Sequence, residues 1–328
     1  MKTETTQNFI VAALTVVALV ALLASYFVPI WWVSLAAPNY PQEAFPQGIR
    51  IHFHFDGVYN GCTDLPKSRL TQETEQRDLG DDLAHREGGA AAKPGEKSQM
   101  GLDCLHEMNT INHYVGMYPI ETGAPVERPL AKFFFAFFAV MMVAFVIRQK
   151  TLQLAILGVG FAAIAAWMVV ELYVKGTLDP FIANYMEEAG RFFKEPGRIA
   201  SWGATLKTVT GVVVAGLIGA MVIVIAGVWK LRNFQLLLAL VPALLPVFFV
   251  MDYAGWLWFF GHNLHPWGAF TVKPFMPTVF GEGKVAQFST FSYPHYGYGL
   301  LLLIFVTMIL ALLIRRKQLR EQGAGGTT

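Results

Sequence analysis

The chain has 328 residues, of which 54% are hydrophobic and only 15% are charged, and its mean hydropathy is +0.44. This composition excludes an ordinary soluble domain and predicts an integral membrane protein in contact with membrane lipid. A formal net charge of +2, without a strongly basic cluster outside the carboxyl terminus, gives no electrostatic footprint for a nucleic acid partner.

The first apolar run extends from Asn8 to about Leu35 and is long enough to cross a bilayer with a core about 30 Å thick. A cleaved signal peptide is the alternative, because the residues around Leu35 faintly resemble a cleavage site. The run is much longer than a signal core of about 7–15 residues, and only Lys2 precedes it as a positive charge. We therefore predict an uncleaved first transmembrane helix within residues 1–35.

A polar extracytoplasmic loop domain is predicted over residues 36–128. Within it, Ile51–Phe55 alternates in the manner of a β-strand and places His52 and His54 on one face. Residues 63–101 are rich in charged residues, Gln, Gly and Ala, and are expected to form a flexible insertion. We expect this insertion to loop out and bring the strand close to the segment that follows it.

Five further spans are predicted in a bundle over residues 129–328. They are about Pro129–Ile147, Leu152–Val174, Thr208–Trp229, Phe234–Phe260 and Gly297–Ile314. The outer loops are 175–207, where an amphipathic interfacial helix is expected, and 261–296. The predicted fold class is an all-α integral membrane protein with six transmembrane helices and a large extracytoplasmic region between the first two.

Short basic stretches decide the predicted orientation. Arg148–Lys150, Lys230–Arg232 and Arg315–Arg320 belong in the cytoplasm by the positive-inside rule, which also places both termini there. The histidines and both cysteines then lie on the extracytoplasmic side or at its edge. The eight histidines are His52, His54, His85, His106, His113, His262, His265 and His295.

This one-sided concentration of donors is typical of copper handling, since sulfur ligands stabilise the monovalent ion and imidazole tolerates both oxidation states. The densest segment is Cys104–Met117, and a helix over Thr110–Met117 would place two of its donors on one face. The candidate metal ligands are His52, His54, Cys104, His106, Met108, His113, Met117, His262 and His265.

Two alternatives compete with the copper hypothesis. Cys62 and Cys104 can form an ordinary disulfide across the insertion, as an oxidising compartment allows, and that would remove the thiol from any metal site. Met108 and Met117 can simply pack on the membrane surface.

Asp252, in the fifth predicted span, and Glu171, near the outer end of the third, are the candidates for a proton or cation path. A carboxylate within a span is costly and usually faces a cavity or a partner. The alternative places both acids in the headgroup layer, hydrated or paired with a nearby lysine. Trp256, Trp258 and Trp267 fit an interfacial aromatic belt.

Some motifs are missing from the sequence. There is no Cys-x-x-Cys-His run, so no covalent c-type haem is expected. No phosphate-binding Gly-Lys-Ser/Thr loop is present, which argues against ATP-driven transport by this chain alone.

Four runs resemble a family of multi-spanning membrane proteins. They are Leu35–Pro41, Thr110–Glu121, Gly261–Leu264 and Lys273–Pro277. The family is the NosB-like family associated with nitrous oxide reductase maturation gene clusters. The resemblance omits the insertion and implies a setting in the bacterial inner membrane, in copper enzyme assembly or its electron supply during denitrification.

Three functional hypotheses follow. The first is an accessory protein that binds copper or docks a periplasmic copper enzyme through its outer loops. The second is a quinol-linked electron-transfer component that works with other membrane subunits and uses Asp252. The third is a scaffold subunit without a cofactor.

Overall fold

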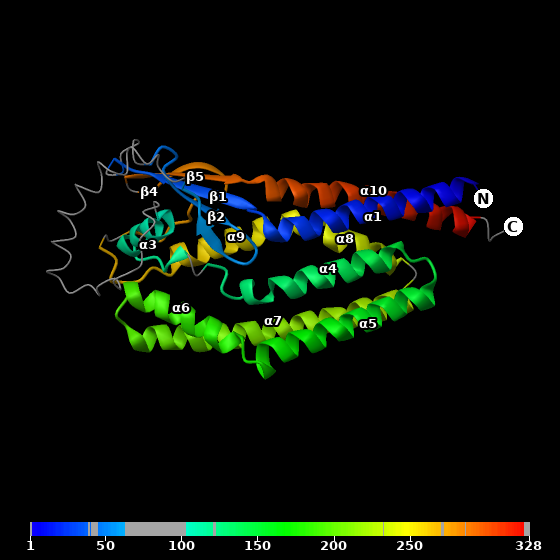
Figure 1. Ribbon diagram of the computed structural model, residues 1–328, viewed down its shortest axis with the longest axis horizontal. Helices are drawn as coiled ribbons and strands as arrows, with labels where there is room; N and C mark the ends of the chain where they lie inside the picture. Colours follow the sequence, from blue (N-terminus) through cyan, green and yellow to red (C-terminus); the bar gives the residue numbers. More distant parts are fainter. Residues whose placement is uncertain are drawn as a thin grey trace, which may run out of the picture.

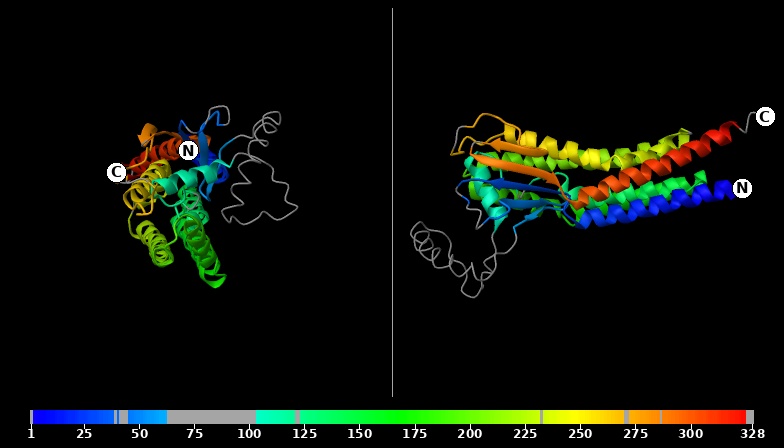
Figure 2. Two further views of the ribbon diagram at one scale, coloured as in Figure 1. Left: turned by 90° about the vertical axis from the view of Figure 1, so that its left-hand side faces the viewer. Right: turned by 90° about the horizontal axis from the view of Figure 1, so that it is seen from above.

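The computed structural model describes residues 2–38, 40, 45–62, 103–120, 123–231, 233–269, 272–285 and 287–324. The predicted insertion over 63–101, with His85, lies outside these residues. The described chain forms a long helical bundle with a small sheet at one end, called here the sheet end (Figure 1). Both chain termini lie at the opposite end, called the terminal end (Figures 1 and 2).

The described helices confirm a mostly helical protein suited to a membrane. Five helical segments are long and apolar enough to cross it. They are α1 (Lys2–Phe27), η3 (Arg128–Leu130) with α4 (Ala131–Val146), α5 (Lys150–Val169) with the π-helical turn η4 (Val170–Val174), α7 (Pro196–Lys230) and α10 (Tyr296–Ala324). The predicted fifth span is instead a bent pair, which brings the total to six if the pair crosses as one.

The bent pair consists of η5 (Phe234–Leu236) with α8 (Leu237–Ala243), followed by α9 (Leu245–His262). The two parts meet at an angle of 55°. Pro242 lies inside α8 and Pro246 lies in the first turn of α9. Because each proline removes a backbone N–H and clashes with the preceding turn, the helix breaks between them.

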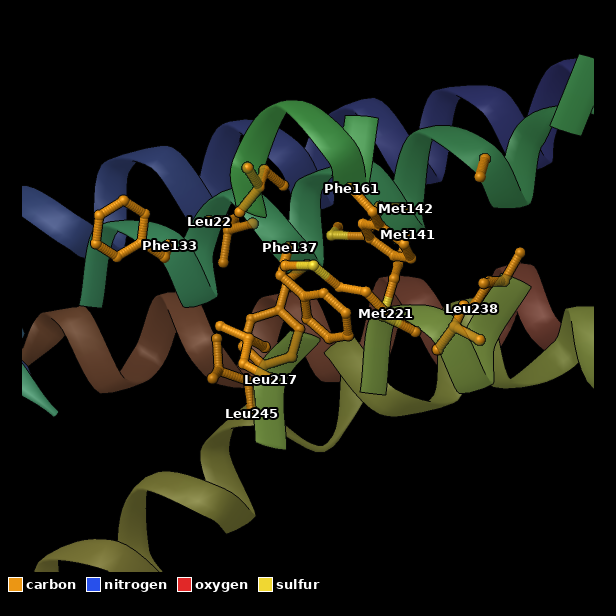
Figure 3. Close-up of a cluster of buried hydrophobic side chains, with 14 of the residues drawn as sticks. Leu22, Phe133, Phe137, Met141, Met142, Phe161, Leu217, Met221, Leu238 and Leu245 are labelled. Atoms are coloured by element: carbon orange, nitrogen blue, oxygen red, sulfur yellow. The ribbon is translucent and has the colours of Figure 1, made fainter. Parts of the chain in front are cut away.

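The bundle core lies around α4, as the close-up in Figure 3 shows. Phe133, Met141 and Met142 of α4 are fully buried. The side chains that surround them are Leu22 of α1, Phe161 of α5, Leu217 and Met221 of α7, Leu238 of α8 and Leu245 of α9. Since lipid chains are as apolar as these residues, close packing rather than removal from water holds such helices together in a membrane.

Three helix ends meet at the terminal end. Arg148, after α4, pairs with Glu4 of α1 at 2.6 Å. Arg315 of α10 donates to the carbonyl of Val146 at 3.0 Å and to Asn8 Oδ1 at 3.5 Å. The basic stretches that were predicted to be cytoplasmic at Arg148 and Arg315 therefore lie together with the amino terminus.

A five-stranded antiparallel sheet contradicts the all-α prediction. The strands are β1 (Trp31–Ala36), β2 (Ile49–Phe53), β3 (Val58–Asn60), β4 (Gly281–Val285) and β5 (Phe288–Pro294), in the order β3-β2-β1-β5-β4. The predicted strand over Ile51–Phe55 is confirmed as β2, two residues earlier. The first helix ends at Phe27, so the apolar residues after it, which had been assigned to the span, form the central strand instead.

Two shorter helices complete the sheet end. α3 (Cys104–Tyr114) packs on β2 through a cluster that includes Ile51, Met108 and Ile111. The helix considered over Thr110–Met117 is present only as far as Tyr114, so His113 and Met117 do not share a helical face. α6 (Leu178–Phe192) corresponds to the amphipathic helix expected in the outer loop, and α7 begins directly after it.

Candidate functional site

A cavity of about 610 Å³ lies in the half of the bundle nearer the sheet end. Its walls come from α4, α7, α8 and α9, and the segments around β2 and before α4 close it at the sheet end. Most of the lining is apolar and rich in aromatic rings. The aromatic lining residues are Phe53, Phe55, Tyr118, Phe134, Phe135, Phe137, Phe138, Phe248, Phe249, Tyr253, Trp256 and Phe260. A volume of this size suits a small amphipathic molecule.

The inner face of the sheet fixes the position of α9 beside this cavity. Trp31 of β1 donates its indole N–H to Ser292 Oγ of β5 at 2.9 Å. The same indole ring packs against Phe249 and Tyr253 of α9, with ring centroids 5.9 and 5.7 Å apart. Phe53 of β2 also contacts Tyr253, at 5.5 Å. The strand that replaces the end of the first predicted span therefore supports one wall of the cavity.

Two carboxyl groups lie on the cavity wall. Asp252 of α9 is hydrogen-bonded to Glu127, which precedes α4. Trp256, one turn after Asp252, donates its indole N–H to Glu127 Oε2 at 2.9 Å. Because two carboxylates have no donor between them, the pair holds at least one proton. Asp252 keeps accessible surface and lines the cavity, so its carboxyl group faces the cavity space.

Burial acts on both carboxyl groups of the pair. Removal from water raises the pKa of Glu127, and the hydrogen bonds from its surroundings oppose this rise only in part. A partly buried acid with a raised pKa beside a second acid is a common arrangement at binding and proton-transfer sites.

Further polar atoms on the wall lack a matched partner. Asn112 Nδ2 of α3 is buried without a hydrogen-bond partner, and Asn112 lines the cavity. Tyr118 also lines it, and its hydroxyl has no well-aligned partner, although Trp202 and Arg198 lie nearby. A buried donor without an acceptor costs about 1–3 kcal/mol, so an oxygen of a bound molecule would stabilise Asn112.

A smaller cavity of about 70 Å³ adjoins the first and shares Asn112, Met117 and Tyr253 with it. It lies between α3, the inner face of the sheet and the loop around Phe275. Met108 and Met117 both line it. The structure thus brings two of the predicted thioether ligands to one cavity, although they do not share a helix.

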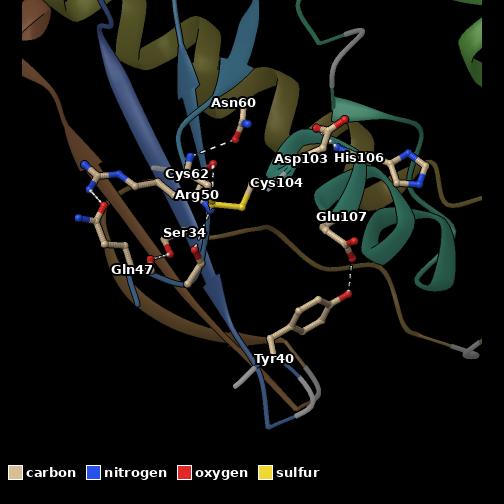
Figure 4. Close-up of a disulfide and its surroundings, with 11 residues drawn as sticks. Ser34, Tyr40, Gln47, Arg50, Asn60, Cys62, Asp103, Cys104, His106 and Glu107 are labelled. Carbon is tan, nitrogen blue, oxygen red and sulfur yellow. Dashed lines mark hydrogen bonds between the residues drawn. A yellow bond between two sulfur atoms is a disulfide. The ribbon is translucent and has the colours of Figure 1, made fainter. Parts of the chain in front are cut away.

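The proposed role of Cys104 as a metal ligand is contradicted. Cys104 forms a disulfide with Cys62, so its sulfur is not a thiolate (Figure 4). The disulfide fastens the start of α3 to the chain that leaves β3. Asp103 caps α3 by accepting the backbone N–H of His106 at 3.0 Å, and the imidazole of His106 is exposed.

His52 lies on β2, and His54 lies directly after this strand and lines the large cavity. The His52 ring is 5.0 Å from that of His295, and the His54 ring is 4.6 Å from that of Tyr59. Burial, followed by the charge of Arg50, lowers the pKa of His52 to about 4. The same guanidinium charge disfavours a metal cation at this position.

His113 and His265 lie between α3, α6 and the loop after α9. The buried His265 ring stacks on Phe193 with centroids 4.2 Å apart, and its Nε2 lies 3.1 Å from Glu195 Oε2. His113 contacts the same Phe193 ring at 5.1 Å. His262, at the end of α9, is exposed, and its Nδ1 lies 2.8 Å from the carbonyl of Trp258. Among the described residues, these histidines do not converge with His52 and His54 on one metal site.

Glu171, the second candidate for the proton or cation path, does not lie beside Asp252. Glu171 bridges Lys132 at 3.1 Å and Lys175 at 3.0 Å, which is the lysine-paired alternative. It does not line the large cavity, whereas Glu127 is the acid beside Asp252.

In the part of the chain that the structure describes, no group of three or more His, Cys, Asp or Glu side chains is arranged to hold a metal ion. No family model, curated protein or solved structure matches the chain. The geometry of its own residues therefore carries the functional argument.

Glu127 and Asn112 were missed from the sequence. Glu127 stands directly before the second span, where an acid is unremarkable in a headgroup layer. Asn112 lies in the middle of the donor-rich segment, where the neighbouring histidine and methionines indicated a copper site instead. The signal for Glu127 was its position at a predicted span boundary, the same criterion that selected Glu171.

Proposed function

We propose that this protein binds an amphipathic, lipid-like molecule in the cavity between α4, α7 and α9. The observation that carries the proposal is the joining of a carboxyl pair and a wall of aromatic and aliphatic side chains in one cavity of about 610 Å³. Such a cavity suits a molecule with a polar head and an apolar chain.

Access from the lipid phase supports the proposal. Gly216 of α7 and Phe248 of α9 line the cavity and are both exposed on the bundle surface. A molecule dissolved in the bilayer can therefore reach the cavity sideways, without crossing the polar region at the sheet end. By the positive-inside rule, the sheet end is the extracytoplasmic side of a bacterial inner membrane.

The proposal is tested with a substitution that fills the cavity. A side chain added at Gly216 meets no atom within 4 Å, so Gly216→Phe occupies cavity space without a clash at its Cβ. Gly219 of the same helix is equally open but does not line the cavity, which makes Gly219→Phe the matched control. Native mass spectrometry of protein released from detergent measures the small molecule retained by each variant.

The wild-type protein and Gly219→Phe are expected to retain about one lipid-like molecule per chain, and Gly216→Phe much less. Equal retention by all three proteins, or no retained molecule in the wild type after extraction in a mild detergent, would overturn the proposal.

Copper handling is the second candidate, because Met108 and Met117 line one small cavity and thioethers suit the monovalent ion. The resemblance to the NosB-like family also supports it. Metal analysis of protein purified anaerobically tests it: copper that is lost in Met108→Leu/Met117→Leu but kept in Met276→Leu, an exposed methionine, would support this candidate. Wild-type protein without copper would remove it.

A further inference from the structure

We propose that the molecule bound in the large cavity is a quinol or quinone with an isoprenoid tail, whose ring hydroxyl donates to Asp252. This inference rests on the proposed function and narrows its ligand to one chemical class. It is carried by the charge of the cavity, the geometry of its rings and the polar atoms that a head group would meet.

The two acids of the cavity disfavour a phosphate head group. Asp252 and Glu127 are both acids, and a phosphate beside them would be repelled. Among the described lining residues, Arg128 is the one permanently charged cation. Its Nε donates to the carbonyl of Asp56 at 3.2 Å, and its guanidinium lies 5.6 Å from the ring centroid of Phe181. The head group that fits is uncharged and offers hydroxyl or carbonyl oxygens.

The aromatic lining favours a flat ring in the ligand. Phe249 and Tyr253 are nearly parallel, at 8° with centroids 6.0 Å apart, and Trp256 stacks on Phe260 at 26° and 5.5 Å. These residues lie on α9, on both sides of Asp252 in the sequence. Aromatic rings pack well against the face or edge of another ring. A saturated acyl chain gains nothing specific from this arrangement.

The polar atoms match the oxygens of a quinol. A ring hydroxyl can donate to the carboxyl group of Asp252, which faces the cavity. Asn112 also lines the cavity, and a turn of its side-chain amide would bring the unpartnered Nδ2 to a second ring oxygen. The oxidised quinone, with two carbonyl oxygens, can accept from Asn112 and from the proton held by the carboxyl pair. Both redox forms therefore find partners at the carboxyl group of Asp252.

The tail has an apolar path. Leu217 and Ala220 of α7, Val241 of α8 and Phe138 of α4 continue the lining away from the carboxyl pair. The opening at Gly216 lets a longer isoprenoid chain extend into the bilayer. A cavity that holds the ring and the first part of the chain suits a ligand of variable tail length.

The experiment measures the binding of decylubiquinol and decylubiquinone, under argon, to the full chain in detergent by isothermal titration calorimetry. Dodecanol, palmitic acid and dioleoylphosphatidylglycerol are the comparison probes. Decylubiquinol is expected to bind at micromolar concentration, with weaker binding of the phosphate lipid. Asp252→Asn is expected to weaken quinol binding about tenfold or more, because the carboxyl group that shares its proton with Glu127 is replaced by an amide.

The controls separate this inference from the proposed function. Glu171→Gln changes an acid of the bundle that does not line the cavity, and it should leave quinol affinity unchanged. Gly216→Phe should abolish binding of every probe, and Gly219→Phe should abolish none.

Binding of dodecanol or palmitic acid that is sensitive to Gly216→Phe, without quinol binding, would overturn the quinol inference and leave the proposed function intact. A quinol affinity unchanged by Asp252→Asn would overturn the role of Asp252. If no probe bound to the wild-type protein, both proposals would be overturned.

Discussion

Trp256 of α9 donates its indole N–H to Glu127 Oε2 at 2.9 Å, across 129 residues of sequence. The bond ties the second half of α9 to the chain that enters α4, on the wall of the large cavity. It also explains why an aromatic residue that fits an interfacial belt is turned inward. A hydrogen bond to an acid in such surroundings is stronger than one between neutral groups.

Replacement of Trp256 by Phe is expected to lower the free energy of unfolding by about 1–3 kcal/mol, because Glu127 loses its indole donor while the ring is kept. The thermal midpoint of the protein in detergent measures the effect. Trp258→Phe is the matched control: Trp258 is 51% exposed, so its replacement should change stability by less than about 0.5 kcal/mol. Equal shifts in the two variants would contradict the structural importance of the bond.

The disulfide gives a second prediction. Cys62→Ser/Cys104→Ser is expected to destabilise the sheet end by about 2–4 kcal/mol, since the bond closes a long loop of chain with a separation of 42 residues. Limited proteolysis with and without a reductant measures the opening of α3 from β2. The sequence contains two cysteines, so the double variant should not respond to the reductant. A wild-type protein equally insensitive to reduction after unfolding and refolding would contradict this role.

The helical part of the fold could be predicted from the sequence because long apolar runs are local signals. The predicted strand β2 was also a local signal, through its alternation. The sheet as a whole could not be predicted, because β1 pairs with β5, whose residues lie more than 250 positions away, as Trp31 does from its register partner Pro294. Hydropathy alone does not separate the half-buried strand after Phe27 from the end of a span.

The candidate site was only partly predictable, because it also depends on contacts between segments that are distant in the sequence. Asp252 could be selected, because an acid within an apolar run is costly wherever the helix goes. Its partner could not, because the bend at Leu244 decides which segment α9 meets. Pro242 and Pro246 signalled that bend, but not its direction. Whether Cys104 bound a metal or Cys62 depended on the folding of the segments around it, which spacing does not show.

The pH dependence of stability gives a third prediction. Burial, with a smaller contribution from Arg50, lowers the pKa of His52 from 6.5 to about 4. Between these values the unfolded chain binds a proton that the folded chain does not, so stability falls as the pH falls from 6.5 toward 4. Burial also lowers the pKa values of His54, His265 and His295, which act in the same direction.

His52→Gln is expected to remove part of this pH dependence, roughly 1 kcal/mol between pH 7 and pH 5 once its partial exposure to water is considered. Thermal midpoints of the wild type and the variant at the two pH values measure it. If the two proteins lost the same stability on acidification, His52 would not be held neutral in the fold.

Gly116 gives the last prediction, because it joins α3 to the loop after α9. Its carbonyl accepts the backbone N–H of His265 at 2.6 Å, and its φ is +83°. A Cβ there would lie 2.5 Å from the carbonyl oxygen of His265, which belongs to backbone and cannot turn away. Gly116→Ala is therefore expected to cost at least about 3 kcal/mol, from backbone strain and overpacking together.

The matched control is Gly176→Ala, since Gly176 has a φ of +67° with no atom within 4 Å of the added Cβ, and strain alone should cost about 1–2 kcal/mol. Thermal unfolding of both variants in detergent separates backbone strain from overpacking. Equal losses of stability would show that the loop carrying His265 moves away from α3 at no cost in free energy.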